Sequence, residues 1–263
     1  MSTFFAIVSR AFQRHLTYRA ATIAGLLTNF FFGLVRGSIF VALIGSRGSL
    51  NGLDAQGVLT YAALGQAMIA YLSIFSWREL MDAVYTGEIS TDLLRPYPLF
   101  TLWMGKDFGR AILNILTRGF VIMLVFEWVW DLYYPQSGGQ WLAVGVSVLL
   151  SWLLSFAFRF LINLSAFWSP EASGFLRFFY TISWFFSGFL MPLRLFPPWV
   201  QTLAQFTPFP HMVNTVTEIY LGLLTGPALF QALLTQLAWA LALSAAGALV
   251  MRAGVRRLVI QGG

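Results

Sequence analysis

The stretch GVLTYAALGQAMIAYLSIFSW, residues 57–77, contains no charged side chain. An α-helix rises about 1.5 Å per residue, so a helix of this length is roughly 30 Å long, which matches the hydrocarbon core of a bilayer. The stretch therefore predicts a transmembrane helix, and the rest of the chain follows the same pattern.

Five further apolar stretches have a similar length. They cover residues 20–44, 109–131, 141–168, 174–192 and 227–251. The chain is 58% hydrophobic and only 10% charged, with a mean hydropathy of +0.74, whereas about a quarter of the residues of a soluble domain are charged. We expect an all-α integral membrane fold with six transmembrane helices, in which residues 1–263 form a single transmembrane domain.

The basic residues lie mainly in alternate connections between these stretches. One side collects Arg10, Arg14, Arg19, Arg78, Arg95, Lys106, Arg110, Arg177, Arg252, Arg256 and Arg257, and the other side collects Arg47 and Arg194. Because cytoplasmic connections are enriched in lysine and arginine, this asymmetry predicts that both termini are cytoplasmic. The net charge of +6 therefore reflects membrane topology rather than nucleic-acid binding.

Two segments outside the predicted spans read as interfacial or short helices. Residues 1–18 place Phe5, Val8, Phe12 and Leu16 at helical spacing, which predicts an amphipathic helix in the membrane interface. Residues 193–226 are rich in proline yet still apolar. Because proline interrupts helices, we expect short outer helices there, between spans five and six.

The cytoplasmic connection 78–107 carries the most specific pattern. Gly87 is placed to break the helix that descends from span two, and Pro96 is placed to end a new short helix. Ile89, Leu93 and Leu94 would share one face of this helix. Such a helix either docks into a groove on another protein or lies on the bilayer surface, and the pattern alone leaves both interpretations open.

A Gly-Glu-Ile at 87–89 followed by Leu-Leu-Arg-Pro at 93–96, after the second of six spans, resembles the permease subunits of ABC-2 type exporters. The similarity extends over nearly the whole chain and is closest to a bacterial branch in which one ATPase accompanies two permease chains. In that family the loop after span two forms the coupling helix that docks on the nucleotide-binding subunit. The resemblance assigns ATPase coupling to Gly87, Glu88, Ile89, Asp92, Leu93, Leu94, Arg95 and Pro96.

The resemblance also implies partners and a location. It implies separate ABC ATPase subunits, which would hold ATP and Mg²⁺, and a second six-span permease, either a sister chain or another copy. It implies residence in the bacterial cytoplasmic (inner) membrane. The sequence contains no G-x-x-x-x-G-K-[ST] loop, so ATP hydrolysis requires the partner, and we expect neither an enzyme nor a cofactor in this chain. The alternative interpretation is a membrane scaffold or a passive channel subunit.

Arg36, Arg118, Glu127 and Arg159 lie inside predicted spans, where ionisable groups are candidates for function. Arg36 and Glu127 have similar predicted depths, so we hypothesise an ion pair; Glu127 could instead join Asp131 in an acidic outer site, or both charges could stay hydrated. Arg118 either extends toward the cytoplasmic interface or faces a translocation path, and Arg159 is interpreted as an arginine that extends to the interface.

Predicted span five contains a run of aromatic residues. The side chains that could form a pathway or a dimer interface are Trp184, Phe185, Phe186 and Phe189, with Gly188 allowing close helix approach. The alternative is ordinary lipid contact and packing. Cysteine is absent, and His15 and His211 stand alone, so the sequence predicts no metal site.

Overall fold

The computed structural model of the protein describes residues 3–16, 19–75, 77–169 and 171–257. These residues form helices and one short antiparallel hairpin. The helices are α1 (Thr3–Leu16), α2 (Arg19–Ile44), α3 (Ala55–Leu72), α4 (Glu79–Tyr85), α5 (Ile89–Leu93), α6 (Leu99–Asn114), α7 (Phe120–Val129), α8 (Gly138–Asn163), α9 (Ser173–Phe186), α10 (Pro198–Gln205), α11 (Asn214–Tyr220) and α12 (Gly226–Val255). The hairpin strands are β1 (Ser49–Leu50) and β2 (Leu53–Asp54), and single turns of helix are η1 (Gly45–Arg47), η2 (Ile115–Gly119), η3 (Leu164–Phe167), η4 (Leu193–Leu195) and η5 (Phe209–His211).

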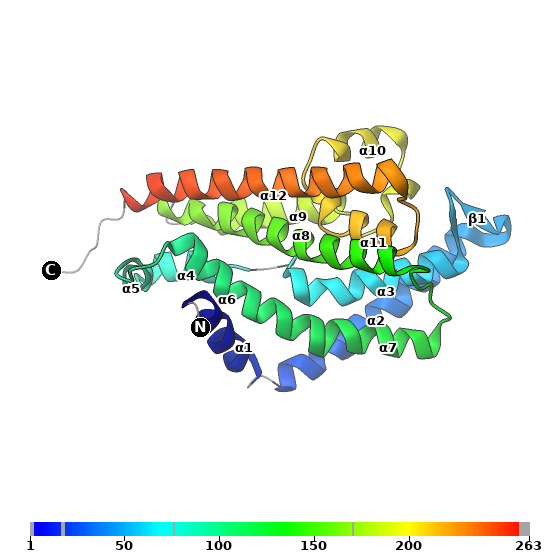
Figure 1. Cartoon of the computed structure of the whole chain (residues 1–263), viewed down its shortest axis with the longest axis horizontal. Helices are drawn as coiled ribbons and strands as arrows, with labels where there is room; N and C mark the ends of the chain where they lie inside the picture. The colour runs from blue at the N-terminus through cyan, green and yellow to red at the C-terminus, as the bar shows by residue number, and fades with distance from the viewer. Residues whose placement is uncertain (1–2, 17–18, 76, 170, 258–263) are drawn as a thin grey trace.

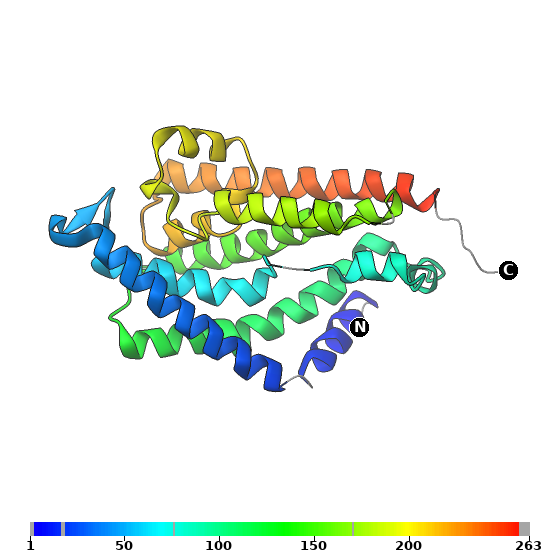
Figure 2. The ribbon, with the colours of Figure 1, turned by 180° about the vertical axis from the view of Figure 1, so that it is seen from behind.

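The long helices run along one axis and give the molecule two distinct ends (Figure 1). One end holds α4 and α5, together with α1 and the last turns of α12, and we call it the α5 end. The opposite end holds the β1–β2 hairpin, α10 and α11, and we call it the α10 end. The view from behind shows the same division (Figure 2).

Within the described part of the chain, four helical segments are long and apolar enough to cross a membrane. They are Thr22–Ile44, Leu99–Val129, Gly138–Phe167 and Gly226–Val255. The third, which is α8 with η3, is the most buried, and it packs against α12, α11 and α3. The other segments expose apolar side chains such as Leu27 and Phe31 along α2, as expected for surfaces that face lipid.

The other two predicted spans are shorter than expected. Residues 57–77 were predicted to be helical throughout, but α3 ends at Leu72 and is followed by Ser73 in a left-handed conformation. Residues 174–192 were predicted as one span, but α9 has only 14 residues, or roughly 21 Å. Gly188, which follows it, has a φ of +80° that ends the helical path.

The helix predicted at 109–131 begins ten residues earlier, at Leu99. It continues through a π-helical turn, η2, into α7. The connection that was predicted to extend to residue 107 therefore ends at Pro98, and Asp107 and Arg110 lie inside a helix.

Helix α1 packs against α6 instead of lying alone at an interface. Gly109 of α6 permits this contact, because a Cβ there would lie 2.4 Å from the backbone oxygen of Val8. The predicted apolar face is divided: Val8 is buried against α6, whereas Phe5 and Leu16 are exposed.

The proline-rich segment contains short helices, as the sequence predicted. Helix α10 lies at the surface, and α11 is buried along its whole length against α8. Arg194 and Glu218 join the two parts of this segment by an ion pair of 2.5 Å.

Candidate coupling site and buried charge cluster

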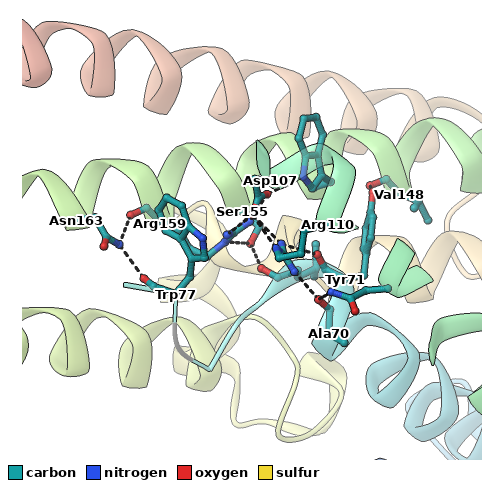
Figure 3. Close-up of polar contacts among 12 residues, drawn as sticks. Ala70, Tyr71, Trp77, Asp107, Arg110, Val148, Ser155, Arg159 and Asn163 are labelled. Carbon is teal, nitrogen blue, oxygen red and sulfur yellow. Dashed lines mark hydrogen bonds and ion pairs between the residues drawn. The ribbon is translucent and has the colours of Figure 1, made fainter. Parts of the chain in front are cut away.

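A cluster of charged side chains lies inside the bundle, where α6 and α8 meet (Figure 3). Asp107 accepts hydrogen bonds from both Arg110 and Arg159, with closest distances of 2.8 Å to each. Its second bond to Arg159, from Nη1 to Oδ1, is 2.9 Å long, so this pair is bidentate. Trp152 donates its indole N–H to the same carboxylate at 2.9 Å. All four side chains are buried.

The cluster satisfies the backbone at the end of α3. The last carbonyl groups of any helix lack partners within that helix, and in a membrane they must find partners in the protein. Arg110 donates to the carbonyl oxygens of Ala70 and Tyr71, at 2.7 and 3.2 Å. Ser155 of α8 donates to the carbonyl of Leu72 at 2.9 Å. A cation near a helix C-terminus also interacts favourably with the negative end of the helix dipole.

Residues 73–75, 77 and 78, which follow α3, are not helical, and side chains of α8 and α9 satisfy backbone groups in this stretch. The Tyr180 hydroxyl donates to the carbonyl of Trp77 and accepts from its amide, at 2.8 and 3.0 Å. Asn163 donates to the Trp77 carbonyl at 2.9 Å and accepts from the Met81 amide at 3.2 Å. Trp184 donates to the carbonyl of Ile74. The stretch that leads to α4 is therefore fixed to α8 and α9.

Helices α4 and α5 form the tip of the α5 end. Gly87 lies between them with a φ of +77°, so it breaks the helix as the sequence predicted. On the inner side of the tip, Ile89 is completely buried, and Asp92 accepts a 2.8 Å bond from Lys106 of α6. The Asp92 carboxylate also lies 3.4 Å from Arg95.

The outer side of the tip is exposed. Leu94 is 86% exposed, and Glu88, Thr91 and Arg95 are exposed beside it. The expected shared face of Ile89, Leu93 and Leu94 is wrong, because Ile89 is buried and Leu94 is exposed. A helix of five residues makes little more than one turn, so positions 89 and 94 face different surroundings.

The tip is connected to the bundle at a second point. The Tyr85 hydroxyl at the end of α4 donates to the carbonyl of Ser169 at 3.0 Å and accepts from the amide of Ala172 at 2.8 Å. Both partners lie in the connection between α8 and α9. Displacement of the tip would therefore be transmitted to α6 through Lys106 and to α8 and α9 through Tyr85.

A family model described as ABC-2 family transporter protein matches residues 30–262 of the chain. The chain belongs to the ABC-2 transporter family. The search of curated proteins found no match. The family is that of the membrane permease components of ABC transporters, which act with ATPase partners, so the sequence-based assignment to this family is confirmed.

The predicted ion pair between Arg36 and Glu127 is not formed in this ABC-2 permease. The Arg36 guanidinium lies over the ring of Phe189, 4.1 Å from its centre. Glu127 accepts a 3.2 Å hydrogen bond from the backbone amide of Leu132. Within the described residues, no ion pair joins the two side chains.

The two deeper arginines differ from each other. Arg159 was interpreted as a side chain that extends to the interface, and this is wrong: it is completely buried and paired with Asp107. Arg118 lies in the π-helical turn, with its guanidinium group close to Gly25 of α2. Both sequence-based interpretations of Arg118 stay predictions.

The aromatic residues at the end of α9 and just after it differ in exposure. Phe185 is exposed, whereas Gly188 and Phe189 are buried within the chain. A Cβ on Gly188 would lie 2.5 Å from the Tyr61 hydroxyl, so this glycine allows close approach to α3 of the same chain. Trp184 and Phe186 are partly buried against the bundle core.

Sequence reasoning missed the place of Asp107 in the buried charge cluster, although a signal was present. Asp107 and Arg110 stand at i and i+3, and Arg159 lies in an otherwise apolar stretch. A basic residue that deep inside a span needs a carboxylate partner, and Asp107 is the acidic residue just before the predicted span 109–131.

Proposed function

We propose that this ABC-2 permease is the membrane subunit of an ATP-driven exporter, and that the tip formed by α4 and α5 docks on a separate ATPase subunit. The observation that carries the proposal is the two-sided tip. Its inner side is held to the bundle by Ile89 and Asp92, and its outer side presents Leu94 between Glu88 and Arg95. An exposed apolar side chain flanked by charges is suited to a protein groove.

The proposal includes the orientation and the number of crossings. The α5 end faces the cytoplasm, as the distribution of basic residues predicts, so both termini are cytoplasmic in a bacterial inner membrane. Six crossings result when α3 with residues 73–75 and 77–78, and α9 with residues 187–191, complete the four long helical segments. Non-helical backbone is tolerated at this depth because side chains of α8 and α9 satisfy it.

The mechanism follows from the contacts of the tip. ATP and Mg²⁺ are bound by the ATPase, and closure of the ATPase pair pushes on residues 86–96. The displacement passes through Lys106 to α6 and through Tyr85 to the α8–α9 connection. The Asp107 cluster ties α6, α8 and the end of α3 together, so these helices move as one body. A second permease chain, identical or related, completes the translocation path.

The proposal is tested by co-purification of the tagged chain with its ATPase from the native host, for wild type and for Glu88→Arg combined with Leu94→Asp. We expect the double variant to lose the ATPase or to uncouple its hydrolysis from the permease, because a desolvated apolar anchor is replaced by a charge. The matched control is Phe206→Asp, at a side chain of similar exposure at the α10 end.

The control should keep the ATPase at the wild-type level. A stable, ATPase-free oligomer that is indifferent to the tip substitutions would contradict the proposal and favour the scaffold or passive channel instead.

A further inference from the structure

A cavity of about 540 Å³ lies at the α5 end, between α1, α6 and the residues around α4. Both ribbon views place α1 beside α6 at this end (Figures 1 and 2). A cavity of this size is within the range of small-molecule sites. Lys106 and Arg95, which contact Asp92 of the tip, are also part of its lining.

The lining of the cavity is strongly basic. Its cationic side chains are Arg10, Arg14, Arg95, Lys106 and Arg110, against the carboxylates of Glu79 and Asp107. The excess of positive charge is thus built into the walls, and a concave wall concentrates the potential.

The cationic side chains of the cavity differ in whether they form ion pairs. Arg110 is held by Asp107, and Lys106 is held by Asp92. Arg10 and Arg14, in contrast, are exposed and form no ion pair with the described residues. Two arginines on successive turns of α1 therefore face the cavity with their donors available.

The apolar part of the lining includes Trp103, which is 5% exposed and whose indole Nε1 is itself buried. The lining also includes apolar side chains such as Ile7 and Leu102, so the space suits a group with both an anionic and an apolar part.

We propose that this cavity binds the phosphate of an anionic phospholipid from the cytoplasmic leaflet, with Arg10 and Arg14 as its main ligands. The position of α1 favours a lipid as the source. Phe5 and Leu16 are exposed on the same helix, which places α1 at the boundary between headgroups and acyl chains. A basic recess at this depth meets anionic headgroups before any other phosphate. The lipid would join α1 to α6 beside Lys106, next to the coupling tip.

The test measures lipid that stays bound to the full chain. The chain is extracted from vesicles of equimolar phosphatidylcholine and phosphatidylglycerol, and retained lipids are counted by native mass spectrometry. We expect wild type to retain phosphatidylglycerol selectively. Arg10→Gln combined with Arg14→Gln should reduce this retention roughly tenfold or more. Both side chains are exposed, so the variant should unfold at the wild-type temperature.

The matched control is Arg252→Gln with Arg256→Gln, which removes the same charge from the end of α12 outside the cavity lining. Its retention should equal that of wild type; equal loss in both variants would show unspecific attraction and overturn the proposal. In a competition arm, inorganic phosphate that displaced the lipid as well as added phosphatidylglycerol does would overturn the lipid assignment. The readout needs no ATPase, so its failure is distinct from failure of the proposed coupling function.

Discussion

The two ends of this permease are each stabilised by a different kind of interaction. At the α5 end, two buried arginines, Arg110 and Arg159, share the buried carboxylate of Asp107. At the α10 end, the Tyr61 hydroxyl lies 2.9 Å from both the Gly188 carbonyl and Asn214, and the Arg194–Glu218 pair keeps access to solvent. Removing one member of a buried ion pair costs much stability, whereas removing one member of a solvated pair costs little. The α5 end should therefore behave as one rigid unit, and the α10 end should adjust piece by piece.

The largest effect is expected at Asp107. Asp107→Asn leaves Arg110 and Arg159 buried without a counter-charge, so we expect about 3–5 kcal/mol of lost stability and low abundance in the membrane. Thermal unfolding of the purified chain in detergent measures the loss. The control is Asp82→Asn, which removes the exposed pair with Arg78 and should cost about 1 kcal/mol or less. Similar stability of the two variants would show that the cluster is not a rigid unit.

An intermediate effect is expected where the α10 end is packed most tightly. Gly188→Ala adds a Cβ 2.5 Å from the Tyr61 hydroxyl at a φ of +80°, so strain and steric overlap should cost about 1–3 kcal/mol. Gly145→Ala is the control, since nothing lies within 4 Å of its Cβ and alanine favours a helix. Its unfolding temperature should be unchanged or slightly raised. A neutral Gly188→Ala would mean that this end relaxes around the added methyl group.

The smallest effect is expected at Glu218. Glu218→Gln removes the partner of Arg194, whose side chain is 32% exposed and can be hydrated instead. We expect about 1 kcal/mol or less, measured by the same unfolding experiment. A loss as large as that of Asp107→Asn would remove the contrast between the two ends.

The sequence predicted the structural features that depend on patterns extending over many neighbouring residues. Apolar length located the long helices, and proline density located the short helices of α10 and α11. The helix break at Gly87 was also predictable, because glycine adopts a left-handed backbone conformation more readily than other residues. These features depend on neighbours in the chain, so a single sequence contains the information.

Features that depend on distant partners were not predictable in the same way. The end of α3 at Leu72 depends on Arg110 and Ser155, which lie in other helices. The environment of Arg159 depends on Asp107, 52 positions earlier, so its apolar sequence context suggested the wrong environment. Equal depth in two spans also does not ensure that two charges face each other, and Arg36 and Glu127 bind elsewhere.

The non-helical stretch after α3 has a consequence for the order of membrane insertion. Its backbone groups at Trp77 are satisfied by Tyr180, 103 positions later in the chain, and the Ile74 carbonyl by Trp184, 110 positions later. Unpaired backbone is excluded from the lipid interior, so this stretch must stay near water until α9 has been synthesised. In the proposed six-crossing topology, the second crossing is completed only after the fifth has arrived, and a ribosome stalled before residue 180 should leave Ile74 and Trp77 accessible to water-soluble reagents.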